Sequence, residues 1–188
     1  MRTVIYSMSV SLDGFIAGPG GDIGFTAPDE ELFRFHVEQT PHIGVELMGR
    51  GLYETMLVWG DPEAAPSGPD ELEFARIWNA IPKVVFSTTL HEVQGNARLA
   101  SDDVADEVAK LRAAPGEGVI SVGGAGLASA LIKLDLIDEY RLFVIPVVLG
   151  GGTRYFPPLD RAIGLELLET RTFGSRVTYL RHRRVPRD

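Results

Sequence analysis

The stretch from residue 119 to residue 134 has the residue types and spacing of a ligand-binding junction. Residues 119–122 are apolar or small, then come Gly123, Gly124, Ala125 and Gly126, and apolar residues recur at helical spacing up to residue 134. This order predicts a strand, a glycine turn and a helix. Glycines let the backbone approach a ligand, and the helix start directs N–H groups and the positive end of its dipole to the same point.

A phosphate suits this junction, and we expect a nucleotide cofactor there. The stretch does not complete the dinucleotide fingerprint G-x-G-x-x-G, because the first gap is missing and position 128 is alanine. A tight strand-to-helix turn that binds nothing has the same local pattern. Both interpretations stay open at this point.

Composition restricts the other kinds of chemistry. The 188 residues include no cysteine and only four scattered histidines, which disfavours a metal site. A net charge of −8 disfavours a nucleic-acid partner, and the basic run 181–187 has the pattern of a solvated strand end. No apolar run is long enough to cross a bilayer. We therefore expect one cytoplasmic domain, residues 1–188, with a small-molecule substrate and neither a nucleic-acid nor a membrane partner.

Strand and helix patterns alternate along most of the chain. The strands and helices that they predict must position this junction. Hydrophobic periodicity and turn residues predict a mostly parallel central sheet with helices on both faces. The expected strands are 2–12, 45–48, 83–87, 97–100, 119–122 and 141–149. The expected helices are 28–40, 50–59, 70–80, 102–112 (capped by Ser101) and 127–134, with a turn-rich segment over 61–69. Two strands at 165–173 and 177–185, joined by a turn at Gly174-Ser175, predict an antiparallel C-terminal hairpin.

Four segments in order resemble one superfamily. They are residues 11–17 (SLDGFIA), 48–54 (MGRGLYE), 83–90 (KVVFSTTL), and Gly123-Gly124 followed by 138–140 (DEY) and 146–152 (PVVLGGG). Together they resemble the dihydrofolate reductase-like superfamily, and within it the reductase domain of bifunctional riboflavin-biosynthesis deaminase-reductases, here as a stand-alone member. The resemblance implies a three-layer α/β fold and NADPH-dependent reduction.

The resemblance also implies roles for single residues. Gly49 and Arg50 would hold the pyrophosphate and the adenosine 2′-phosphate, although Arg50 could instead cap a helix and pair with Glu54. Ser87 and Thr88 would reach ribose or phosphate, or only cap a turn. Gly123 and Gly124 would take the other side of the pyrophosphate, with a cis peptide between them.

The resemblance implies that Ile16 and Ala17 flank the nicotinamide and that Asp13 lies beside the substrate. Asp13 is expected there as a catalytic residue, although an Asp-Gly turn explains it equally well. The glycines at 18, 20 and 21 suit a mobile lid. For the proton donor, Glu31 is preferred among the three acids Asp29, Glu30 and Glu31, against the alternative that all three are exposed helix-start charges.

The chain departs from the family at two points. Gly51-Leu52 lacks the threonine that many dihydrofolate reductases carry there, and the phosphate contacts typical of riboflavin reductases are not evident. The deaminase zinc motif requires cysteine and is excluded. The resemblance favours reduction of 5-amino-6-(5-phosphoribosylamino)uracil, with pterin reduction and a non-catalytic nucleotide-binding module as alternatives. A homodimer through the C-terminal strands is also expected.

Overall fold

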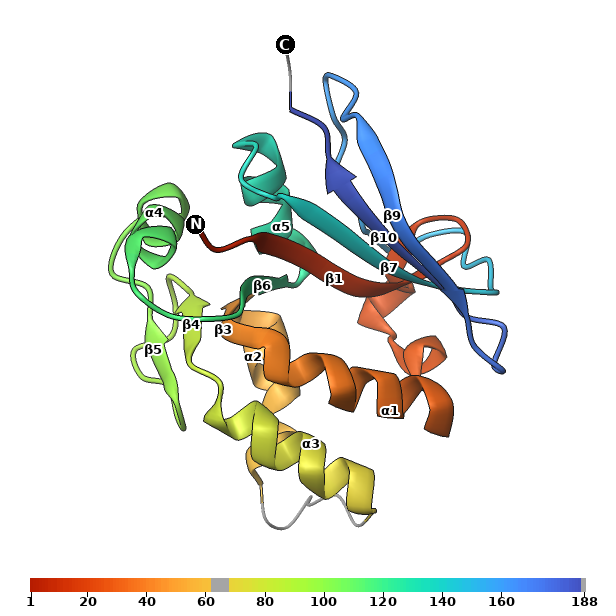
Figure 1. The fold of residues 1–188 in the computed structure, drawn as a ribbon, viewed down its shortest axis with the longest axis horizontal. Coiled ribbons are helices and arrows are strands. Elements are labelled where there is room, and N and C mark those ends of the chain that lie inside the picture. The colour runs from red at the N-terminus through yellow and green to blue at the C-terminus, as the bar shows by residue number, and fades with distance from the viewer. Residues whose placement is uncertain (62–67, 187–188) are drawn as a thin grey trace.

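The fold is built around one eight-stranded sheet (Figure 1). It was obtained as a computed structural model, which describes residues 1–61 and 68–186. The strand order is β5-β4-β3-β6-β1-β7-β10-β9. These strands are β1 (Val4–Ser11), β3 (Ile43–Gly49), β4 (Lys83–Phe86), β5 (Ala97–Leu99), β6 (Val119–Gly123), β7 (Glu139–Ile145), β9 (Leu165–Thr172) and β10 (Thr178–Arg184).

The first six strands of that order pair in parallel, as the alternating pattern predicts. Strand β10 then runs antiparallel to β7, and β9 runs antiparallel to β10. The C-terminal hairpin is confirmed: the Phe173 N–H donates to the Val177 carbonyl at 2.9 Å, so Gly174 and Ser175 lie in the turn. A separate two-stranded sheet pairs β2 (Phe15–Ala17) with β8 (Thr153–Arg154).

Helices cover both faces of the large sheet (Figure 1). On one face lie α1 (Glu30–Gln39), α2 (Arg50–Met56) and α3 (Pro69–Ala80), and on the other lie α4 (Val104–Ala113) and α5 (Ala125–Lys133). The α4 and α5 face buries the largest apolar cluster, which includes Val108, Leu127 and Leu131. Helix α1 packs with the hairpin through Leu32 and Phe35. The three-layer α/β fold expected from the sequence is therefore present.

Three expected elements end or begin elsewhere. The helix expected over 50–59 ends at Met56 and continues as a 3₁₀ turn, Leu57–Gly60. The strand expected over 141–149 ends at Ile145, because Pro146 has no N–H to continue the ladder. Helix α4 is capped by Asp103 and not by Ser101: the Asp103 carboxylate accepts from the Asp106 N–H at 3.0 Å.

Several expectations fall partly on residues that the structure does not describe. Residues 62–67 of the turn-rich segment and Arg187 of the basic C-terminal run lie outside the described residues. Within the described part of that run, Arg181 pairs with Glu139 and Arg183 pairs with Glu166, so these cations serve strand pairing. Among the helices that the structure describes, none is long and apolar enough to cross a membrane.

Candidate cofactor site at the carboxyl edge of the sheet

The residues predicted to bind the cofactor gather at one edge of the sheet. Parallel strands end at the same edge, and β3 lies between β4 and β6. The register places Met48 opposite Gly123 and Gly49 opposite Phe86. Gly49, Ser87 and the glycine turn therefore come together, although they are far apart in the sequence.

The backbone conformation of the glycine turn favours glycine at position 124. Gly124 has φ +87°, a backbone conformation that L side chains rarely adopt. A Cβ on Gly123 would overlap the Leu52 side chain of α2. Helix α5 begins directly afterwards, with Ala125 and Gly126 as its first residues. Since the first N–H groups of a helix have no partner within it, the turn presents backbone donors at this edge.

The prediction of a cis peptide between Gly123 and Gly124 is wrong. All peptide bonds between described residues are trans. The chain changes direction at this point through the positive φ of Gly124.

Arg50 stands at the start of α2 beside an open hollow of about 480 Å³. Its Nε donates to Glu54 Oε1 at 2.7 Å and its Nη1 donates to Thr89 Oγ1 at 2.9 Å. The pair with Glu54 is thus formed, yet 51% of the Arg50 side chain remains exposed. The rest of the hollow is lined by Phe86, Ser87, Thr88, Thr89, Ala100 and Asp102.

Ser87 caps the turn after β4 and also lines the hollow. Its hydroxyl oxygen accepts from the N–H groups of Thr89 at 3.1 Å and Leu90 at 3.0 Å. Thr89, which holds Arg50, was missed by the sequence reasoning, although it follows the Ser87-Thr88 pair directly. Asp102, in the segment between β5 and α4, also lines the hollow. No local sequence pattern connects it to Arg50.

Asp13 is fixed by three hydrogen bonds. Its carboxylate accepts from the Ser11 hydroxyl at 2.7 Å and from the N–H groups of Leu149 at 3.1 Å and Gly150 at 2.7 Å. These bonds, first the one from Ser11, lower its pKa to about 2. Asp13 therefore stays ionised near neutral pH and ties the end of β1 to the glycine-rich loop 149–152.

Ile16 and Ala17 lie in β2, which pairs antiparallel with β8. The Ile16 side chain is buried in the main apolar cluster with Tyr155. Gly152 packs so closely that a Cβ there would overlap the Ala17 carbonyl oxygen. The Tyr155 N–H also donates to the Gly14 carbonyl at 2.9 Å. These contacts fasten residues 14–17 to the loop after β7.

Glu31 connects α1 with the hairpin. Its carboxylate accepts from the Gly174 N–H at 2.8 Å and from Arg171 at 3.3 Å. Its neighbour Asp29 caps α1 by accepting from the Leu32 N–H at 2.9 Å. The structure therefore brings Glu31 to the hairpin turn, and its hydrogen bonds do not involve the glycine turn.

A buried acid that the sequence reasoning missed lies under the glycine turn. Glu46 of β3 faces Ser121 of β6 and Lys83 of β4 in the strand register. A Cβ on Gly123 would stand 3.1 Å from Glu46 Oε1. Burial raises the pKa of Glu46 to about 7, against the opposing effects of the Ser121 hydrogen bond and the Lys83 charge. The sequence feature that could have revealed Glu46 is the position of an acidic residue inside the otherwise apolar run 45–48.

Comparisons with known proteins show which family and fold the chain shares. A sequence profile described as the RibD C-terminal domain matches residues 2–179. The uncharacterized protein YyaP of Bacillus subtilis (strain 168) is 35% identical over 181 residues, covering 95% of this chain and 93% of YyaP.

Two solved structures show the same fold. A putative riboflavin biosynthesis protein from Shewanella sp. PV-4 has a TM-score of 0.78 at 23% identity, covering 99% of this chain and 100% of that one. Dihydrofolate reductase from Enterococcus faecalis, complexed with NADP(H), has a TM-score of 0.64 at 17% identity, covering 97% of this chain and 96% of that one. The chain thus has the dihydrofolate reductase-like fold and belongs to the RibD C-terminal domain family.

Proposed function

We propose that this protein is an NADPH-dependent reductase of a nitrogen heterocycle or a related carbonyl or imine. The observation that carries the proposal is the glycine turn at Gly123-Gly124, which lies beside the start of α2 and the Arg50 hollow on one sheet edge. Backbone donors suit a pyrophosphate, and an exposed guanidinium suits a 2′-phosphate. Membership of a reductase-domain family supports the same assignment.

The described residues fit the cofactor in two groups. The N–H groups at Ala125 and Gly126 and those at Gly49 and Arg50 would bind the pyrophosphate, because both helix starts lie at this edge. The Arg50 side chain, with Thr88 and the Ser87 hydroxyl beside it, would bind the 2′-phosphate. The bound nicotinamide would supply the hydride.

Asp13 and Glu46 have different proposed roles: Asp13 stays ionised near neutral pH, whereas Glu46 changes its charge there. Asp13 would hold the loop 149–152, and with it residues 14–17, in place beside the nicotinamide. Glu46 lies under the glycine turn with a pKa near neutrality, so we assign the pH dependence of reduction to it. Glu31, kept here as a catalytic candidate from the sequence, is bound to the hairpin turn.

Within this class, reduction of 5-amino-6-(5-phosphoribosylamino)uracil is the substrate assignment that the family supports best. Pterin reduction is the second candidate, and the fold shared with a dihydrofolate reductase favours it. The hydrogen bonds that occupy Glu31 favour the third, a nucleotide-binding module without turnover.

We also propose a homodimer through β9. This strand is the edge of the sheet and is exposed along its whole length, with Leu167 53% exposed. Unpaired edge strands are templates for pairing with another chain. Light scattering that gives the mass of one chain at all concentrations would contradict this dimer.

The test of the reductase assignment has two steps. First, unfolding temperature is followed against NADPH and NADH. A ligand present at about 100-fold over its Kd stabilises the folded state by roughly 2.7 kcal/mol. NADPH should stabilise the protein much more than NADH. Second, NADPH consumption is followed with the uracil substrate and with dihydrofolate. No thermal shift with either cofactor would contradict the cofactor assignment, whereas binding without consumption would favour the non-catalytic module.

A further inference from the structure

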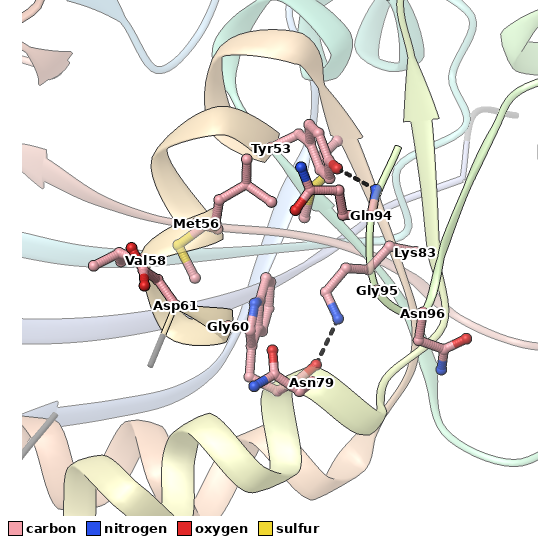
Figure 2. Close-up of a pocket in the computed structure, with 13 residues that line it drawn as sticks. Tyr53, Met56, Val58, Gly60, Asp61, Asn79, Lys83, Gln94, Gly95 and Asn96 are labelled. Atoms are coloured by element: carbon pink, nitrogen blue, oxygen red, sulfur yellow. Dashed lines mark hydrogen bonds between the residues drawn. The ribbon is translucent and has the colours of Figure 1, made fainter. Parts of the chain in front are cut away.

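A second cavity, of about 730 Å³, lies away from the Arg50 hollow (Figure 2). It opens between α2 with its 3₁₀ extension, the end of α3, and the segment 94–96 that precedes β5. None of the residues predicted to bind the cofactor lines it. Its volume is in the range of small-molecule sites, roughly 300–1,000 Å³.

The walls of this cavity combine polar and apolar side chains, and the apolar part includes aromatic and sulfur-containing residues. These residues are Met48, Tyr53, Met56 and Trp78. Thioethers and aromatic rings make favourable contacts with one another, and such a lining suits a flat aromatic molecule. Gly95, with φ +66° and no atom within 4 Å of where a Cβ would stand, leaves room at the segment 94–96.

Lys83 places one positive charge at the base of the cavity. Its side chain is only 8% exposed, and its ammonium lies 4.7 Å from the centre of the Trp78 ring. Figure 2 shows the Lys83 ammonium directed toward the end of α3 near Asn79, with Met56 on the other side of the cavity. Burial lowers the pKa of Lys83 to about 8, so it remains mostly charged near neutral pH.

The Lys83 ammonium donates fewer hydrogen bonds to the described residues than it has N–H groups. It donates to the carbonyl oxygens of Trp78 and Ile81 at the end of α3. An ammonium has three N–H donors, which leaves one for a ligand as far as the described part of the chain shows. Glu46 faces Lys83 from β3 with a pKa of about 7, and Asp61 lies at the Val58 side of the cavity, across from the ammonium.

We propose that this cavity binds a small aromatic carboxylate, with its ring between Met56 and Trp78 and its carboxylate accepting a hydrogen bond from Lys83. One ammonium without an arginine matches a singly charged group better than a phosphate. Asp61 sets the orientation, since it repels the anionic end from the opposite side of the cavity. This inference does not depend on the proposed reductase function.

Tryptophan fluorescence can test the proposal directly. The chain has two tryptophans: Trp78 lines the cavity, whereas the Trp59 ring packs against Phe33 and Phe74. The probe is 4-iodobenzoate, whose iodine quenches nearby tryptophan, and 4-iodobenzamide is its uncharged control. Saturable quenching by the carboxylate is expected, with at least tenfold weaker binding of the amide. Quenching that rises linearly and equally for both compounds would overturn the proposal.

Variants locate the site. Lys83→Met should weaken binding of 4-iodobenzoate at least tenfold, and an unchanged Kd would overturn the proposal. Because Lys83 also bonds to the end of α3, Val58→Phe provides a second variant: Val58 lines the cavity and is 43% exposed, and we expect a larger side chain there to reduce the space for the ligand. Binding unaffected by Val58→Phe would also overturn it. Arg50→Ala should leave binding intact, whereas loss of binding would place the anion in the cofactor site instead.

Discussion

The two halves of the candidate cofactor site are built differently. At the start of α5 the ligand-facing surface is backbone: Gly124 has a positive φ, and a Cβ at Gly123 would displace the end of the Leu52 side chain. At the start of α2 the surface is side chain, and Arg50 is exposed with partners on two elements. Changes in the first half should therefore affect folding and binding together, whereas changes in the second should affect binding alone.

The largest effect is expected from Gly123→Ala. The new Cβ would displace the Leu52 Cδ2 methyl and crowd Glu46 Oε1, and overpacking against such side-chain ends costs about 1 kcal/mol. Urea unfolding should show that loss, and NADPH stabilisation should disappear with it. Gly126→Ala is the matched control: no atom lies within 4 Å of its Cβ position, so stability should rise by about 0.5–1 kcal/mol.

The double variant Gly123→Ala/Leu52→Ala tests the stated cause. Removing the Leu52 side chain should make the alanine at 123 much less costly than it is in the presence of Leu52. Additive losses in the double variant would show that the overlap with Leu52 is not the reason for glycine at this position.

Arg50→Ala should separate binding from stability. Loss of a charge-assisted contact to a phosphate costs about 1.5–3 kcal/mol, or roughly 10–150-fold in NADPH affinity. The free energy of unfolding should change by less than about 0.5 kcal/mol, because the Glu54 pair is exposed. Titration calorimetry with NADPH and NADH measures the first quantity. Glu54→Gln should keep or tighten NADPH binding, and an equal loss in both variants would contradict the direct phosphate contact.

Glu46→Gln should remove a pH dependence of the free energy of unfolding. Glu46 lies beside Gly123, in the half of the site that is formed by backbone. The pKa of Glu46 is raised from 4.5 to about 7 in the folded state, so folding holds a proton that the unfolded chain releases. Stability should therefore fall as pH rises through this window, by an amount on the order of 1–3 kcal/mol. Urea unfolding across the window should show a flatter profile for the variant. Parallel profiles would contradict the raised pKa.

The smallest effect is expected from Asp13→Asn. The pKa of Asp13 is depressed to about 2, so its ionised form adds stability above its unfolded value of 3.8, and that contribution is lost as pH falls toward 2. The variant should be less stable near neutral pH and equal to the parent near the acid end. Should the difference persist at low pH, the charge of Asp13 would not be its source.

Much of the fold follows from local patterns. Alternating strand and helix periods predicted the parallel sheet, and Gly174-Ser175 predicted the hairpin, because turn chemistry and hydrophobic periodicity act within a few residues. Element ends were less well predicted. Helix α4 begins at the cap that Asp103 provides, two residues after the cap expected at Ser101, and both residue types favour the N-cap position.

The sequence by itself determined which residues could contact phosphate: the glycines at 123 and 124, Arg50 at a helix start, and Ser87 after a strand. Only the tertiary structure decided what their neighbours are. Strand order brings Glu46 under Gly123, Leu52 against it, and Asp13 to the loop 149–152. Such contacts join residues far apart in the chain, and their free energy depends on burial and register, which no local pattern encodes.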